Sequence, residues 1–282
     1  MSLPLRGGVA VVTGAASGIG AALAEALAAR GCGLALADVD AAGLSGVAER
    51  ARRRGVAASE HRLDVADEGA VAAFPAAVLA EHGRVRVLVN NAGVALGGRF
   101  EQTDPADFEW LFSINFWGVV RMTRAFLPVL RREPGAAQIV NLSSVFGIVA
   151  PPGQAAYAAS KFAVRGFSEA LRHELEAEGA KVGVTVVLPG GVRTAIAANA
   201  RRGGMDKAER AAQAELWERL LRLPPEAAAE RIARGIERRE KRVLVGRDAR
   251  QVALVQRLLP VGYWSVLERL ADRWSKRGPA RG

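Results

Sequence analysis

The chain alternates short apolar runs with longer stretches in which apolar side chains recur at helical spacing. Such runs are typical of strands that are buried in a parallel sheet. Strands that alternate with helices predict right-handed β-α-β units. The pattern therefore predicts an α/β fold, with a doubly wound parallel sheet and helices on both of its faces. The strands expected are residues 9–13, 34–37, 85–89, 138–142, 182–188 and 243–245.

Length and composition fit one such unit. The chain has 282 residues, and 50% of them are apolar, which is enough for a sheet buried on both faces. Neither an internal repeat nor a low-complexity linker divides the chain. We therefore expect a single domain over residues 1–282, in which residues 195–223 form a lid and residues 251–282 form a C-terminal helical extension.

A glycine-rich turn follows the first predicted strand. Gly14, Gly18 and Gly20 precede residues 21–30, which are strongly helix-forming. The free N–H groups at a helix N-terminus can hold a pyrophosphate, and glycine lets the backbone approach it closely. The turn therefore predicts a single-domain Rossmann-type dinucleotide-binding fold. The alternative is a tight turn without a ligand.

Asp38 ends the second predicted strand. Its distance from the last glycine of the turn is close to the ~20 residues that are expected for a ribose-binding acid. A carboxylate accepts hydrogen bonds from the ribose hydroxyls of NAD and repels the 2′-phosphate of NADP. Neither Ser17 nor Val39 supplies the positive charge that NADP would need. We therefore expect NAD, with NADP as the second choice. The alternative is that Asp38 or Asp40 caps the next helix.

Tyr157 and Lys161 are one helical turn apart, which places their side chains on one helix face. An ammonium group beside a phenol lowers the pKa of the phenol from about 10. Such a tyrosine can exchange a proton with an alcohol or a ketone. Ser144 lies upstream, where a strand end could hold its hydroxyl against the substrate oxygen. The alternative is an exposed tyrosine near a solvated lysine.

These residues belong to a longer series of motifs in which the chain resembles the short-chain dehydrogenase/reductase (SDR) family. The motifs occur in the order that the family has, from residue 13 to residue 194. They are residues 13–20, Asp64-Val65, residues 90–93, Asn115, Ser143-Ser144, Tyr157 with Lys161, and residues 189–194.

The resemblance implies a role for each residue. Tyr157 is the acid/base, Lys161 binds the nicotinamide ribose and lowers the pKa of the tyrosine, and Ser144 orients the substrate oxygen. Asn115 holds a water that connects Lys161 to solvent; its alternative role is to stabilise a helix kink or cap. The implied cofactor-binding residues are Gly14, Ser17, Gly18, Ile19, Gly20, Asp38, Asp64, Val65, Asn91, Ala92, Gly93, Tyr157, Lys161, Pro189, Gly190, Val192 and Thr194.

The function implied is hydride transfer between NAD, or less favourably NADP, and a secondary alcohol or ketone. Two alternatives remain for the activity, and a third, a membrane-associated enzyme, depends on the end of the chain. One is an NADPH-dependent ketoreductase that acts on acyl substrates, and the other is a catalytically silent NAD-binding interaction protein. The resemblance also implies a homodimer or homotetramer.

Two segments offer an apolar surface to a substrate. Residues 145–150 form an apolar run after Ser144, and residues 195–223 contain a predicted helix over 206–223. Ala212, Leu216, Leu220 and Leu223 are its expected apolar face. In SDR proteins the corresponding segment tends to cover the substrate, so we expect residues 195–223 to be a lid and the substrate to have an apolar body. The alternative is that this helix packs on its own domain or on a neighbouring subunit.

The end of the chain, residues 251–282, predicts two further amphipathic helices, over 253–259 and 261–274, on either side of Pro260. The second has an apolar stripe flanked by basic side chains. One interpretation is peripheral contact with an anionic membrane, and the one we prefer is packing against the core or a partner subunit. The stripe consists of Trp264, Leu267, Leu270, Ala271 and Trp274.

The net charge of +10 does not by itself indicate a nucleic-acid partner, because the basic residues are scattered and aromatic residues do not alternate with them. His61, His82 and His173 lack metal-ligand spacing, so we expect no metal site. Cys32 is the only cysteine, which excludes an internal disulfide. Without a visible signal peptide or an apolar run of roughly 18 residues, we expect a cytoplasmic protein with no membrane span.

Overall fold

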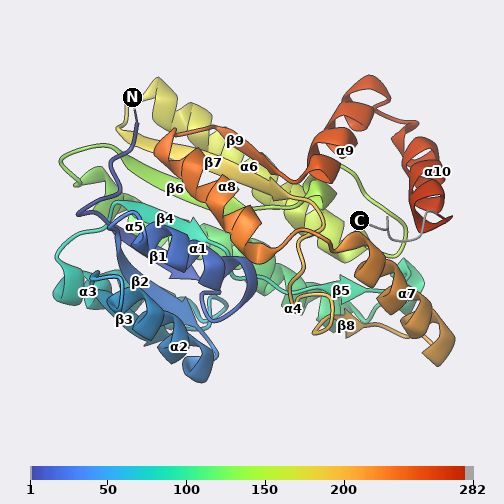
Figure 1. The fold of residues 1–282 in the computed structure, drawn as a ribbon, viewed down its shortest axis with the longest axis horizontal. Coiled ribbons are helices and arrows are strands. Elements are labelled where there is room, and N and C mark those ends of the chain that lie inside the picture. The colour runs from blue at the N-terminus through green and yellow to red at the C-terminus, as the bar shows by residue number, and fades with distance from the viewer. Residues whose placement is uncertain (1, 277–282) are drawn as a thin grey trace.

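The computed structural model describes residues 2–276, and its centre is a seven-stranded parallel sheet (Figure 1). The strand order is β3-β2-β1-β4-β6-β7-β9, in which every neighbouring pair is parallel. The predicted α/β fold of Rossmann type is therefore confirmed. The strands are β1 (Val9–Thr13), β2 (Gly33–Asp38), β3 (Ala58–Arg62), β4 (Val87–Asn90), β6 (Ala137–Leu142), β7 (Val182–Pro189) and β9 (Arg242–Val245).

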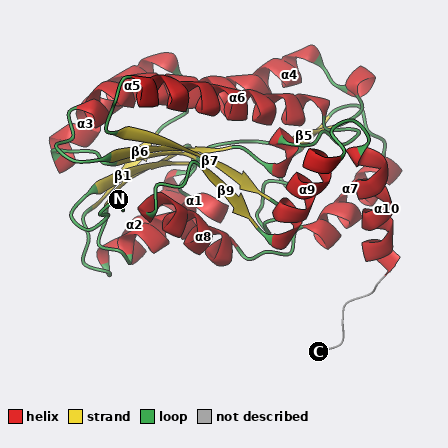
Figure 2. Ribbon diagram, turned by 90° about the horizontal axis from the view of Figure 1, so that it is seen from above, coloured by secondary structure: helices red, strands yellow, loops and turns green. Residues whose placement is uncertain are grey.

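Helices cover both faces of the sheet, as Figure 2 shows. Successive side chains of a strand point to opposite faces, so Ala10 and Val12 join one apolar core and Val11 joins the other. The first core is closed by α1 (Gly18–Ala28), α2 (Ala41–Arg52) and α8 (Pro225–Glu237). The second is closed by α3 (Glu68–His82), α5 (Gly118–Arg131) and α6 (Ala155–Ala177).

Around Asn115 the sequence is typical of one helical stretch over about residues 107–131, and the structure interrupts that stretch. It consists of α4 (Pro105–Phe112), the π-helical segment η2 (Ser113–Trp117) and α5. Asn115 lies in η2, and its buried amide is hydrogen-bonded to the backbone of Val94. A side chain held in this way accounts for the local change of helix geometry, which is a common cause of such bulges.

Residues 195–223, the predicted lid, are attached to the rest of the chain by a second sheet, which sequence reasoning missed. In this sheet β5 (Leu96–Gly97) pairs with β8 (Arg201–Arg202), and α7 (Lys207–Leu220) follows. The helix ends before Leu223 because the backbone N–H groups of Arg222 and Leu223 donate to the carbonyl of Gly191.

The apolar face expected for this helix is wrong at two of its positions. Ala212 and Leu216 are exposed, whereas Leu220 and the adjacent Trp217 are half-buried. The side of α7 that faces the protein is therefore the one that carries Trp217 and Leu220, and the side that carries Ala212 and Leu216 faces solvent.

The last two helices are α9 (Arg247–Leu258) and α10 (Tyr263–Lys276). Tyr263 and Leu267 pack against Ile148 and Val149, and the Tyr263 hydroxyl accepts a hydrogen bond of 3.1 Å from the Ala150 N–H. Leu267 belongs to the predicted stripe and Tyr263 lies beside it, so these contacts support the packing interpretation. The side chains of Leu270, Ala271 and Trp274, and the whole of residues 277–282, lie outside the described part of the chain.

Among residues 2–276, no helix has both the length and the apolar character that a membrane crossing requires, and no group of acidic, histidine and cysteine side chains could hold a metal ion. The fold does bring two of the three histidines together. The Nε2 atoms of His61 and His82 each lie 2.7 Å from the Ser59 hydroxyl. That contact joins β3 to the end of α3.

Glu133 is a buried carboxylate, with 2% of its side chain exposed, that accepts hydrogen bonds from Arg84 and Arg86. Burial raises the pKa of Glu133, but the two guanidinium groups outweigh it and hold the pKa below 4.5. A carboxyl group with a lowered pKa stabilises the fold above its unfolded pKa, and that contribution is lost as the pH falls through the folded value.

We therefore expect Glu133→Gln to reduce the free energy of unfolding at pH 7 by about 1.5 kcal/mol, because it leaves Arg86 without its charged partner while Arg84 can turn to water. The difference between variant and parent should shrink below pH 4.5. Urea unfolding at both pH values measures it. The control is Glu178→Gln, which breaks the half-exposed pair with Arg131 and should change stability by less than about 0.5 kcal/mol. Equal losses in the two variants would contradict this account.

Candidate functional site

The predicted site residues gather at the carboxyl ends of the parallel strands, where open α/β sheets bind nucleotides. The glycine turn occupies the end of β1. Gly14 and Gly18 have φ angles of +64° and +54°, and a Cβ on Gly20 would lie 2.0 Å from the Gly14 carbonyl oxygen. Glycine is therefore required if α1 is to start this close to the strand.

The first turn of α1 keeps its N–H groups available. Ser17 is the exposed N-cap residue, and its side chain makes no capping hydrogen bond, while Ile19 packs partly against the first core. Uncapped N–H groups and the positive end of the helix dipole suit the pyrophosphate of a dinucleotide.

The sequence left open whether Asp38 or Asp40 caps the helix that follows, and the structure distinguishes the two residues. The Asp40 carboxylate caps α2 by accepting a hydrogen bond from the Gly43 N–H at 3.1 Å. Asp38 stays at the end of β2, where its carboxylate accepts from the N–H groups of Ala16 at 3.0 Å and Asp40 at 3.1 Å. Each oxygen of Asp38 takes one of these bonds and keeps a free lone pair, so the carboxylate can still accept from ribose hydroxyls.

Thr13 and Asn91 hold the glycine turn against the end of β4. The Thr13 hydroxyl accepts from the N–H groups of Asn91 at 3.0 Å and Ala92 at 3.1 Å. The Asn91 amide donates to the carbonyls of Thr13 and Gly14. The Asn91 side chain thus supports the turn itself. Sequence reasoning quoted Thr13 as part of a motif but did not include it among the site residues.

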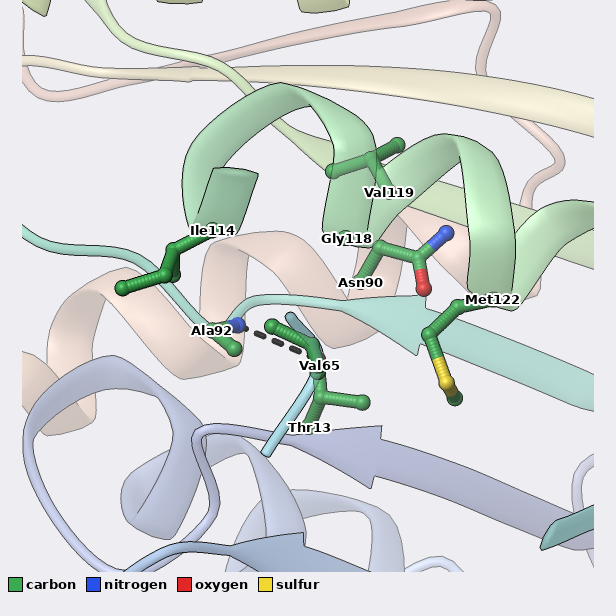
Figure 3. Close-up of a pocket in the computed structure, with 8 residues that line it drawn as sticks. All are labelled: Thr13, Val65, Asn90, Ala92, Ile114, Gly118, Val119 and Met122. Carbon is green, nitrogen blue, oxygen red and sulfur yellow. Dashed lines mark hydrogen bonds between the residues drawn. The ribbon is translucent and has the colours of Figure 1, made fainter. Parts of the chain in front are cut away.

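A narrow void lies behind these residues, and Figure 3 shows its walls. It is too small to admit a water molecule. The Val65 side chain lines it, is 6% exposed, and would lie 2.7 Å from a Cβ on Gly118. Asp64 is exposed and accepts a hydrogen bond from the Ala66 N–H. Of this predicted pair, only Asp64 therefore offers its side chain to the surface.

Tyr157 and Lys161 lie on one face of α6, as predicted, and Ser144 follows the end of β6. The Lys161 ammonium lies 5.7 Å from the centre of the Tyr157 ring and donates to the Leu142 carbonyl at 3.1 Å. The Ser143 hydroxyl donates to the Lys161 carbonyl at 2.7 Å, which joins α6 to the strand end. The Ser144 hydroxyl accepts from the Phe146 N–H at 3.1 Å.

The pKa of Tyr157 differs from the sequence-based expectation. Burial raises the pKa of Tyr157 to about 12, although its hydrogen bond with Ser144 lowers it in part. Burial also lowers the pKa of Lys161 to about 8. The ammonium faces the Tyr157 ring and is hydrogen-bonded to the Leu142 carbonyl, so desolvation outweighs attraction between the two side chains. In the protein alone, Tyr157 is therefore a neutral phenol near pH 7.

Asn115 is fully buried, and its amide is held by protein groups. Its Nδ2 donates to the Val94 carbonyl at 3.0 Å and to the Ser160 hydroxyl at 3.3 Å, while its Oδ1 accepts from the Val94 N–H at 2.8 Å. This geometry favours the structural interpretation of the side chain. Its part in a water relay stays a prediction. Gly93 lies beside it, since a Cβ there would be 3.1 Å from Asn115 Oδ1 and 3.5 Å from Lys161 Nζ.

The segment after β7 closes the other side of the site. Pro189 ends the strand, and a Cβ on Gly190 would lie 2.1 Å from the carboxylate of Asp248. Asp248 is a residue that sequence reasoning missed, and it accepts a hydrogen bond of 2.6 Å from the Gly191 N–H. The only signal in the sequence was an acidic residue in the first turn of a helix.

Val192 and Thr194 connect this segment to the lid and to the glycine turn. Val192 is buried and forms a β-bridge with Leu223, at the end of the lid segment. A Cβ on Gly18 would lie 3.1 Å from the Thr194 methyl group. The structure thus brings Thr194 to the start of α1.

Three aromatic side chains from different elements meet beside Ser144. Phe146 belongs to the short helix η3 (Val145–Gly147), Tyr157 to α6 and Trp217 to α7. The ring centre of Phe146 is 6.1 Å from that of Tyr157 and 6.0 Å from that of Trp217. The predicted apolar wall therefore includes a contact with α7.

Residues 8–204, well over half of the chain, match the protein family described as short chain dehydrogenase, and the chain belongs to this family. It is 45% identical over 259 residues to SadH of Mycobacterium tuberculosis, itself only provisionally assigned as an oxidoreductase. That match covers 92% of this chain and 93% of SadH.

Two solved structures extend the comparison. One is a short-chain dehydrogenase/reductase from Burkholderia phymatum in complex with NAD, with a TM-score of 0.81, 32% identity and 99% of each chain covered. The other is a metagenomic short-chain oxidoreductase in complex with NADP, with a TM-score of 0.61 and 38% identity, which covers 66% of this chain and 84% of that one. Structural relatives of this chain therefore bind either nicotinamide cofactor.

Proposed function

We propose that this protein is an NAD-dependent oxidoreductase that transfers a hydride between the nicotinamide and a secondary alcohol or ketone. The observation that carries the proposal is the placement of Ser144, Tyr157 and Lys161 at the same sheet edge as the glycine turn and Asp38. When bound, the nicotinamide supplies the hydride acceptor or donor. The residues of the chain supply the binding surface and the proton.

Tyr157 is the proton donor for reduction and the proton acceptor for oxidation. In reduction, the carbonyl carbon gains a hydride and the carbonyl oxygen gains the phenolic proton, which gives a neutral alcohol. The Ser144 hydroxyl donates a hydrogen bond to the same oxygen and orients it. Lys161 places a positive charge near the phenolate that forms, which favours that charged state.

Asp38 supports NAD over NADP. Its carboxylate sits at the strand end, beside the glycine turn, and repels a second phosphate on the ribose. The remaining cofactor contacts that we propose are those of the glycine turn, Asp64, residues 91–93 and residues 189–194. The NADPH-dependent ketoreductase and the silent NAD-binding protein remain the alternatives, and cofactor preference and turnover distinguish them.

The substrate that we propose has an apolar body. Phe146 and Trp217 present aromatic surface beside Tyr157 and Ser144. The test of the proposed function is titration of the purified protein with NADH and NADPH, followed by turnover of a panel of secondary alcohols and ketones that vary in apolar size. Tight NADH binding with turnover supports the proposal. A strong preference for NADPH would favour the ketoreductase, and binding without any turnover would favour the silent protein.

Trp217→Ala should raise KM for the bulkiest ketone of the panel by about tenfold and leave kcat nearly unchanged, because it removes apolar surface away from the reacting oxygen. The control is Leu216→Ala on the same helix, since Leu216 is exposed. Steady-state kinetics with a small and a bulky ketone measures both variants. An equal change for the two ketones would show that Trp217 does not contact the substrate body.

We also propose that the protein is a homodimer or homotetramer, as the SDR resemblance implies. Sedimentation velocity of the purified chain tests it, and a monomer over the accessible concentration range would refute it.

A further inference from the structure

The last turn of α9 and the turn that leads to α10 expose a cluster of aliphatic side chains, and we call this segment the elbow (residues 254–261). Val261 is 92% exposed, Leu258 69%, Leu254 57% and Leu259 44%. Single exposed aliphatic side chains are ordinary on a protein surface, but a cluster indicates a contact surface. Elsewhere in the described chain, large apolar side chains of comparable exposure do not gather in one short segment.

The elbow continues a row of arginines on α9. Arg247, Arg250 and Arg257 are all exposed, and their spacing puts them on the helix face that also carries Leu254 and Leu258. Within residues 2–276, none of the three forms an ion pair, although many other arginines of the chain do. The acid nearest to them in the sequence, Asp248, is bonded to the Gly191 N–H.

The hairpin that carries the elbow is anchored on both sides. Asp248 ties the start of α9 to the segment after β7, and Tyr263 ties the start of α10 to Ala150. Figure 1 shows α9 and α10 as a projection at one corner of the molecule. The elbow is therefore a convex, supported projection.

We propose that the elbow docks onto the surface of an anionic lipid bilayer. Leu254, Leu258, Leu259 and Val261 enter the headgroup region, and the three arginines contact lipid phosphates. Apolar side chains that enter the interface and basic side chains that attract anionic lipid phosphates are the two contributions that hold a surface segment on such a bilayer. A second copy is a poorer occupant, because a two-fold contact through this surface would bring arginines of both copies together. The proposal does not depend on the reaction that the protein catalyses.

The experiment is cosedimentation of the full chain with vesicles of phosphatidylcholine, with and without phosphatidylglycerol. We expect binding only when phosphatidylglycerol is present. The combined variant Arg247→Glu, Arg250→Glu, Arg257→Glu should bind at least about 100-fold more weakly, because each basic side chain near an anionic surface contributes roughly fivefold and each new carboxylate is repelled. Leu258→Asp with Val261→Asp should bind at least about 10-fold more weakly.

Matched controls separate the elbow from net charge and from general apolarity. Arg53→Glu, Arg54→Glu, Arg132→Glu changes the same charge on other exposed surfaces, and Phe100→Asp changes another exposed apolar side chain, which is 74% exposed. Both controls should bind vesicles within about threefold of the parent, since both surfaces lie outside the elbow. NADH titration and circular dichroism of every variant establish that it is folded.

Three results would overturn the proposal. The first is that the parent protein binds neither kind of vesicle. The second is that the charge-matched control loses as much binding as the arginine variant. The third is that the parent binds no vesicles and that Leu258→Asp with Val261→Asp forms a smaller oligomer than the parent. The last result would assign the elbow to an interface between copies of the chain.

Discussion

Tyr157→Phe should lower turnover of the best alcohol or ketone by about 1,000-fold, with NADH affinity within about threefold of the parent. The substitution removes one hydroxyl and keeps the ring that packs against Phe146. The proton that the substrate oxygen gains or loses then has no donor or acceptor within reach. Hydride transfer without a coupled proton would create a charged alkoxide in a partly buried site, which is costly.

The control is Tyr263→Phe, which removes the hydroxyl of the chain's only other tyrosine. That hydroxyl accepts from the Ala150 N–H and lies on the C-terminal hairpin, so the variant should retain most of the turnover. Single-turnover and steady-state rates, together with fluorescence titration of NADH, measure both variants. If Tyr157→Phe kept the parent's rate, Tyr157 would have no part in the chemistry.

Asp38→Ala should reduce the ratio of NADH to NADPH affinity by about 10- to 100-fold. Hydrogen bonds to a carboxylate contribute about 1.5–3 kcal/mol, and the substitution also removes the negative charge that opposes a 2′-phosphate. The same change deprives the Ala16 N–H of its acceptor, so some general loss of affinity accompanies the change of ratio.

Asp40→Ala is the matched control for this prediction. Asp40 lies two positions away and caps α2, so its loss should cost about 1 kcal/mol of stability and leave the cofactor ratio unchanged. Isothermal titration calorimetry measures the affinity of both variants for both cofactors. Equal discrimination in Asp38→Ala and the parent would contradict the role that we propose for Asp38.

The fold could be predicted from the sequence because most strands of the main sheet are buried on both faces. The exception is β3, which is partly exposed and was not predicted. Runs such as residues 9–13 have few polar positions, and helices of regular period follow them. The glycine turn was predictable for a related reason. Only glycine fits where a Cβ would lie 2.0 Å from a carbonyl oxygen, so the residue type itself reports the close contact.

The parts that could not be predicted depend on contacts between distant residues. Asn115 interrupts a helix because of Val94, and Leu223 leaves α7 because Gly191 accepts its N–H. The raised pKa of Tyr157 likewise follows from burial, which the spacing of Tyr157 and Lys161 does not contain. Local periodicity carries none of this information.

The most direct test of the central claim follows the hydride itself. Purified protein is incubated with NADH that carries deuterium at both positions of C4 of the nicotinamide, together with each ketone of the panel. Mass spectrometry of the product alcohol then locates the label. We predict deuterium on the carbinol carbon with the parent protein and almost none with Tyr157→Phe. Tight NADH binding with no labelled alcohol from any ketone would contradict the claim that this site transfers a hydride to a carbonyl carbon.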